Sequence, residues 1–190
     1  SRYSIQFGKT PARLSLIRVG MNTDHIDHMG FISIPKALKK INNEYRAAHF
    51  GKWGMGSNPS VLGYDISDGP TKNKHGNFDN NKSQWKNVIK KDPKNIFSLT
   101  DKAIQFIDIC SEKKTPFFLQ ISHYAVHSTI ESKSNSYTHF KEKPKGNQHI
   151  DPGFAAMTFN LDESLEILLK KIKDLELEDN TYIFYMSDNG

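Results

Sequence analysis

The sequence predicts an α/β fold with a largely parallel sheet flanked by helices, on three observations. Helix-type and strand-type patterns alternate along the chain, as in sheets built from strand–helix–strand units. Two short runs are almost continuously apolar, which is typical of strands covered on both faces. With 36% hydrophobic and 11% aromatic residues, the 190-residue chain also has enough apolar material for one core of ordinary size.

Three helices are predicted from apolar periodicity. The longest covers about residues 152–175, and its apolar residues recur every three or four positions as one stripe: Phe154, Met157, Leu161, Leu165, Leu168, Ile172 and Leu175. A second begins near Ser98, where residues 98–101 resemble a capping box, and runs to Cys110. The third covers about residues 34–43.

Buried strands are predicted at residues 117–121 and 182–186, and a weaker pattern predicts another at residues 47–50. Residues 57–92 and 128–148 are polar and show no clear period, so both are predicted to be long loops. Loops of this length in a compact domain are often functional.

Composition excludes several classes of protein. The net charge is +5, but 22 of the 26 basic residues are lysines spread along the chain, whereas nucleic-acid binders concentrate charge and favour arginine. A single cysteine, Cys110, excludes an internal disulfide framework and a cysteine-rich zinc site. No apolar run is long enough to span a bilayer. We therefore expect neither a nucleic-acid partner nor a membrane span in this chain.

Polar groups follow each predicted strand, where ligands bind in open α/β sheets. Asp188 and Asn189 end one strand, His127 follows another, and Lys52 lies in a glycine-rich turn after the third. Carboxylate and amide oxygens suit Ca²⁺ or Mg²⁺ rather than zinc. Each pattern also has an ordinary explanation: a plain turn, a loop histidine and a solvated lysine, respectively.

Taken together in chain order, the motifs resemble those of the sulfatases, in the alkaline-phosphatase-like superfamily. Residues 1–14 resemble the latter part of the sulfatase signature, C-x-P-S/T-R followed by x-x-x-L-T-G-R/K. The further matching segments are residues 48–56, similar to G-K-W-H-L-G, then 63–65, 116–127, 154–164 and 180–190. The resemblance covers essentially the whole chain, and several motifs in the right order are more specific than any one.

The resemblance implies a sulfuric ester hydrolase that uses a formylglycine nucleophile and a divalent cation, Ca²⁺ or Mg²⁺. By motif position, Asp188 and Asn189 are cation ligands. The nucleophile and two further metal aspartates are expected upstream of residue 1, because Ser1 and Arg2 match the end of the signature. Residues 1–190 would then be the central part of a catalytic domain, incomplete on both sides and inactive alone.

The same resemblance implies roles for four basic residues. Arg2 and Lys9 would fix the geometry around the formylglycine and the metal, while Lys52 and His127 would contact the sulfate. His127 would also donate a proton to the leaving alcohol.

Two positions depart from the family pattern. Gly54 stands where the family has a histidine after G-K-W, and Phe7 stands where it has a threonine. The missing histidine would help to deprotonate the formylglycine hydroxyl. His25, His28 and His75 are the nearby histidines that could replace it.

Partner, compartment and alternative functions follow from the resemblance. The expected partner is a sulfated small molecule or polysaccharide, and the expected location is periplasmic or secreted; the sequence leaves the oligomeric state open. Two alternatives stand beside the sulfatase. One is a phosphoryl-transfer relative, such as a phosphodiesterase or phosphonate hydrolase, and the other is a non-catalytic homologue that binds sulfated glycans.

Overall fold

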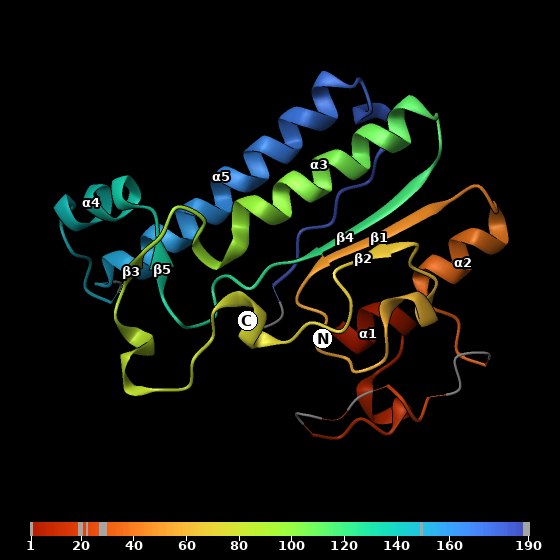
Figure 1. Cartoon of the computed structure of the whole chain (residues 1–190), viewed down its shortest axis with the longest axis horizontal. Helices are drawn as coiled ribbons and strands as arrows, with labels where there is room; N and C mark the ends of the chain where they lie inside the picture. The colour runs from red at the N-terminus through yellow and green to blue at the C-terminus, as the bar shows by residue number, and fades with distance from the viewer. Residues whose placement is uncertain (1, 19–20, 22, 27–29, 149, 188–190) are drawn as a thin grey trace.

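A computed structural model describes residues 2–18, 21, 23–26, 30–148 and 150–187 of the chain. Its centre is a parallel three-stranded sheet with strand order β2-β1-β4. The strands are β1 (Arg46–Gly51), β2 (Ile66–Ser67) and β4 (Phe117–Ser122). Helices lie on both sides of this sheet (Figure 1), as the sequence predicts for an α/β fold.

One face of the sheet is covered by two long helices, α3 (Ile96–Glu112) and α5 (Pro152–Asp174) (Figure 1). Ala48 and Phe50 point from β1 to this face, because side chains alternate along a strand. They pack in a cluster with α3 residues and Tyr124: Leu99, Ala103, Phe106, Cys110 and Tyr124. The buried thiol of Cys110 is one of these packing groups.

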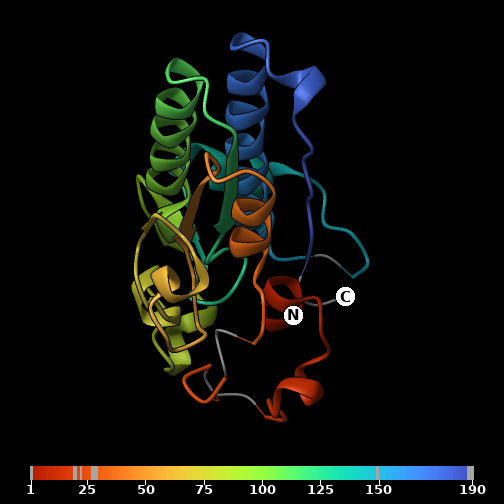
Figure 2. The same ribbon diagram turned by 90° about the vertical axis from the view of Figure 1, so that its right-hand side faces the viewer.

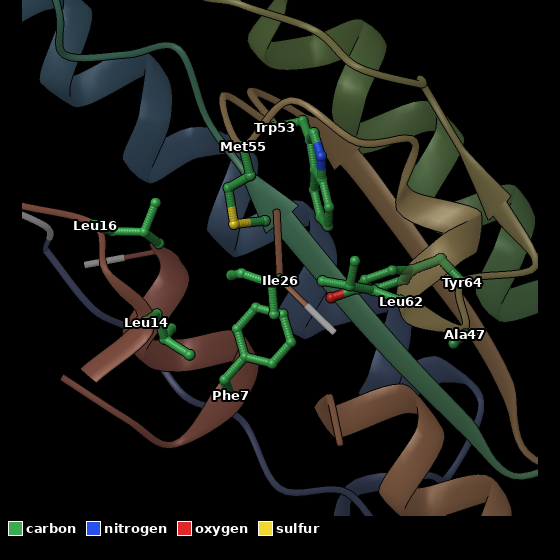
Figure 3. Close-up of a cluster of buried hydrophobic side chains, with 9 residues drawn as sticks. All are labelled: Phe7, Leu14, Leu16, Ile26, Ala47, Trp53, Met55, Leu62 and Tyr64. Carbon is green, nitrogen blue, oxygen red and sulfur yellow. The ribbon is translucent and has the colours of Figure 1, made fainter. Parts of the chain in front are cut away.

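The opposite face carries a second core, shown in Figure 3. It joins β1 to the short helix α1 (Arg2–Phe7) and to the segments around it, and its members are Phe7, Leu14, Leu16, Ile26, Ala47, Trp53, Met55, Leu62 and Tyr64. Helix α2 (Ile34–Ile41) lies on the same side of the sheet (Figure 1). Because residues from the N-terminal segment and from the turn after β1 share this core, their relative positions are fixed.

The remaining elements are short. Strands β3 (Val88–Ile89) and β5 (Glu131–Ser132) form a separate parallel pair, and α4 (Ser134–Glu142) packs beside α5. The 3-10 turns are η1 (Pro11–Leu14), η2 (Pro59–Leu62), η3 (Asn73–Gly76), η4 (Lys82–Trp85), η5 (Pro93–Asn95) and η6 (Glu178–Asn180). None of the described helices is both long and apolar enough to cross a bilayer.

Most predicted elements are confirmed: α2, α3, α5, β1 and β4 are all present. Helix α3 begins two residues before Ser98, because the Asp92 carboxylate accepts hydrogen bonds from the first-turn amides of Phe97 and Ser98. The prediction that residues 57–92 and 128–148 are long loops is wrong in part, since the first stretch contains β2 and β3 and the second contains β5 and α4. Helix α4 is short and mostly polar, with Tyr137 and Phe140 as its large apolar residues, so its sequence gives little helical signal.

The predicted strand at residues 182–186 is also wrong. The segment is extended but pairs with none of the described strands (Figure 2). Its side chains are open to solvent, and Tyr182 and Phe184 are 92% and 84% exposed. An apolar run becomes a strand only when another strand supplies hydrogen bonds, and sequence pattern does not report that partner.

Candidate active site

Strands β1 and β4 end side by side, and Lys52 is the first residue beyond this junction. The register pairs Gly51 with Ser122, and the Lys52 amide donates to the Ser122 carbonyl at 2.7 Å. Gly51 has a φ of +93°, and a Cβ there would lie 2.2 Å from the Ser122 carbonyl oxygen. Only glycine therefore permits this close approach of the two backbones.

The turn of residues 51–54 is held by hydrogen bonds from the segment after β2. The Gly51 amide donates to Asp68 Oδ2 at 2.9 Å, and the Trp53 amide donates to Thr71 Oγ1 at 2.8 Å. The Gly54 amide donates to the Thr71 carbonyl at 2.8 Å, and the Thr71 hydroxyl donates to the Gly51 carbonyl. With the Lys52 bond, every backbone amide of the turn has a partner, so its backbone is fixed.

A chain of buried and half-buried polar side chains lies on the α1 side of the sheet next to this turn. His49 Nε2 lies 3.0 Å from Ser122 Oγ, which also accepts from Gln120 Nε2 at 3.2 Å. Gln120 Oε1 accepts in turn from Tyr64 at 2.8 Å and from Gln6 at 2.6 Å. Helix α1 is thus joined to the strand ends by side-chain hydrogen bonds as well as by apolar packing.

His49 is neutral in the folded protein. Burial is the main cause that lowers its pKa to about 4; the Arg2 charge acts in the same direction, and Asp68 opposes it. Its Nδ1 is buried without a hydrogen-bond partner among the described residues. We assign the proton to Nε2, because a buried N–H without an acceptor is costlier than a bare lone pair.

His127 lies at the same sheet edge, in the turn after β4. Its ring is exposed and meets the Phe78 ring edge to face, with centroids 4.9 Å apart. Nδ1 lies 2.7 Å from the Ser128 carbonyl oxygen, which can only accept, so Nδ1 carries a proton. Nε2 is then the atom that can exchange a proton with a ligand.

Arg2 is brought to the turn that carries Lys52, and Lys9 packs on an aromatic ring. The three heavy atoms nearest to an ideal Cβ at Gly54 all belong to the Arg2 guanidinium, at 2.9–3.5 Å. The Lys9 ammonium instead lies 5.2 Å above the Phe31 ring.

Two of the three histidines suggested as replacements, His25 and His75, bind backbone groups away from Gly54. His25 Nε2 lies 3.0 Å from the Leu14 carbonyl oxygen, and His75 Nδ1 accepts from the Lys72 amide at 2.9 Å. His28 lies outside the described residues. The space next to Gly54 belongs to Arg2 instead.

The predicted cation ligands, Asp188 and Asn189, also lie outside the described residues. Within the described ranges, no three His, Cys, Asp or Glu side chains come together in a way that could hold a metal ion. The metal site therefore stays a prediction.

A hollow of about 280 Å³ lies beside the turn. Its lining includes Asp68, Thr71, His75, Ser98, Lys102 and Tyr124. Asp68 and Thr71 thus both support the turn and face this hollow, and Lys102 pairs with Asp68. Sequence reasoning missed both residues, because residues 57–92 carry no periodic or motif signal at these two positions.

Comparison with known proteins decides the family, because the Sulfatase family profile matches residues 2–190. This chain belongs to the sulfatase family. A curated sulfatase relative is the uncharacterized sulfatase YdeN of Escherichia coli strain K12, 26% identical over 222 aligned residues. That match covers 100% of this chain and 38% of YdeN, so the chain spans well under half of the relative's length.

Solved structures of other proteins show the same fold. Ps i-CgsB matches with a TM-score of 0.70 and 20% identity, over 95% of this chain and 45% of that one, and is also known in complex with k-i-k-neocarrahexaose. BT33336S-sulf, from work on glycosaminoglycan metabolism by Bacteroides thetaiotaomicron, matches with a TM-score of 0.69 and 17% identity, over 95% and 50%. The predicted sulfatase-like α/β fold is thereby confirmed.

Proposed function

We propose that the protein containing this chain is a sulfuric ester hydrolase that cleaves sulfate esters of a carbohydrate or an aryl alcohol. The observation that carries the proposal is the fixed turn at the joint end of β1 and β4, which holds Lys52 at the sheet edge shared with His127. Family membership supports the reaction class. The neocarrahexaose complex of Ps i-CgsB guides the choice of carbohydrate to test.

The two side chains meet separate needs of the reaction. When the S–O bond of a sulfate ester breaks, negative charge develops on the leaving oxygen, and cations near the sulfate oxygens lower the barrier. We assign the Lys52 ammonium to the sulfate oxygens. With Nδ1 bonded to Ser128, a doubly protonated His127 can donate from Nε2 to the leaving oxygen.

The nucleophile and the cation complete the proposal. A hydrated formylglycine supplies a nucleophilic hydroxyl, and Ca²⁺ or Mg²⁺ supplies charge stabilisation at the sulfate. Asp188 and Asn189 are the residues of this chain that we propose as cation ligands, since their oxygens suit these ions. Arg2 and Lys9 are proposed to keep this region in place.

The test uses the full-length protein with a chromogenic aryl sulfate and with sulfated carrageenan oligosaccharides, measuring released sulfate. We expect sulfate release, and a loss of kcat/KM of about 100-fold or more in Lys52→Ala. Lys170→Ala is the control, because Lys170 lies on the exposed side of α5 and pairs with Asp174. Release of phosphate from an aryl phosphate without sulfate release would instead support the phosphoryl-transfer alternative. Glycan binding without any hydrolysis would support the binding-only homologue.

A further inference from the structure

The Arg2 guanidinium lies in the space that a side chain at position 54 would occupy. Gly54 has a φ of +64°, and an added Cβ would lie 2.9 Å from Arg2 Nη2 and 3.5 Å from both Cζ and Nε. The guanidinium therefore covers the Cα of Gly54 directly. Any side chain at position 54 would displace it, in addition to the strain of a positive φ.

The place of Arg2 follows from how α1 is anchored. The next residue is Tyr3, whose hydroxyl donates to the Met21 carbonyl. The same hydroxyl oxygen lies 3.5 Å from the Gly54 carbonyl oxygen. One turn further along α1, Gln6 Nε2 donates to the Tyr64 hydroxyl at 2.7 Å and to Gln120 Oε1 at 2.6 Å. Both ends of α1 are thus tied to the turn and to the sheet, so the guanidinium is held at Gly54.

Two basic residues consequently meet at one short turn. Lys52 precedes Gly54 by two residues on a backbone whose amides are all hydrogen-bonded, and Arg2 covers Gly54. The positive charge of Arg2 also acts on His49 behind the turn. Guanidinium presents planar paired donors that match two oxygens of a tetrahedral oxyanion, whereas ammonium acts as a point charge.

We propose that Gly54 is a positioning residue, whose lack of a side chain admits Arg2 as a second direct ligand of the sulfate beside Lys52. This inference rests on the proposed function and assigns to Arg2 a contact with the substrate rather than only a role in local geometry. It also gives a reason for the absence of the family's histidine here, since a side chain at position 54 would force the guanidinium of Arg2 to move.

The test is a double-mutant cycle in the full-length protein, measuring the Kd for inorganic sulfate by calorimetry and the KM and kcat for an aryl sulfate. We expect Gly54→Ala and Arg2→Gln each to weaken sulfate binding by about tenfold, and the double variant to be no weaker than either, because both changes remove one contact. Gly54→His, which restores the family residue, should also weaken binding instead of improving activity.

Gly8→Ala is the matched control. Gly8 has nearly the same φ, +60°, but a Cβ there would meet no atom within 4 Å, so it carries the backbone strain alone. Thermal unfolding of each variant separates strain from loss of binding. Unchanged sulfate Kd in Gly54→Ala, multiplicative losses in the double variant, or gain of activity in Gly54→His would each overturn the proposal. A wild-type protein that binds sulfate through Arg2 but releases none would instead contradict the proposed function.

Discussion

Gly51 is the residue at which a single methyl group would disturb the site most directly. An alanine Cβ would lie 2.2 Å from the backbone oxygen of Ser122, and backbone cannot move aside as a flexible side chain can. We predict that Gly51→Ala lowers the free energy of unfolding by at least about 2 kcal/mol, from this overlap and from the positive φ. Urea unfolding of the variant and the wild type measures this loss.

Gly69→Ala is the comparison for this prediction. Its φ is +77°, and nothing lies within 4 Å of an added Cβ, so it should lose only about 1 kcal/mol. Equal losses in the two variants would show that the close approach to Ser122 costs nothing.

His49 makes the stability of the fold depend on pH. Its pKa is about 4 in the folded protein, against about 6.5 in the unfolded chain, so the unfolded state binds more protons between these values. The contribution of neutral His49 to the free energy of unfolding is therefore fully present above about pH 6.5. It is lost as the pH falls towards 4, and it amounts to about 3 kcal/mol. Burial lowers the pKa of His123 in the same direction.

His49→Gln tests this, since glutamine keeps a donor for Ser122 but does not titrate. Urea unfolding at several pH values from 7.5 to 4.5 should show a shallower pH dependence in the variant than in the wild type, with the remainder due to other groups such as His123. Parallel curves would contradict the assignment to His49.

At the scale of elements, the turn after β1 is positioned by a segment that has little regular structure of its own. Thr71 contributes three hydrogen bonds to it: its hydroxyl accepts from Trp53 and donates to Gly51, and its carbonyl accepts from Gly54. We predict that Thr71→Val, which keeps the shape but removes the hydroxyl, raises KM for an aryl sulfate several-fold and lowers stability by about 1–3 kcal/mol.

Thr71→Ser keeps the hydroxyl and should retain most of the wild-type KM. Steady-state kinetics of the two variants in the full-length protein make the comparison. Equal KM values in both would show that the hydrogen bonds of this hydroxyl do not position Lys52.

The elements that the sequence predicts well are those whose signal is local. The stripe along α5 and the apolar run of β4 are set by periodicity, and both elements are present with nearly the expected bounds. Motif order likewise predicts that Lys52 and His127 each follow a strand, and the structure shows that these two strands are neighbours. The support from Thr71 and the contact of Arg2 with Gly54 join residues 18 and 52 positions apart, and no local pattern encodes such pairs.

At the scale of the whole molecule, residues 182–186 show that an apolar sequence pattern does not by itself determine burial. Their composition is that of a core strand, and the family resemblance agrees with that interpretation, yet in this structure they pair with no described strand. Burial is a property of the assembled sheet, so an apolar run without a strand beside it remains at the surface. The surface of this chain therefore carries a contiguous apolar stretch.

This stretch should govern the solution behaviour of the 190-residue chain. Phe184 and Tyr182 bury little area, so replacing both by serine should leave thermal unfolding nearly unchanged. The same change should reduce binding of a hydrophobic dye and concentration-dependent association in sedimentation experiments, because exposed apolar patches drive both.

Ile172→Ser is the contrasting variant. Ile172 is buried in α5, so its replacement should lower the unfolding temperature without reducing association. A large loss of thermal stability in the double serine variant would show instead that residues 182–186 are packed in solution, as the sequence alone predicts.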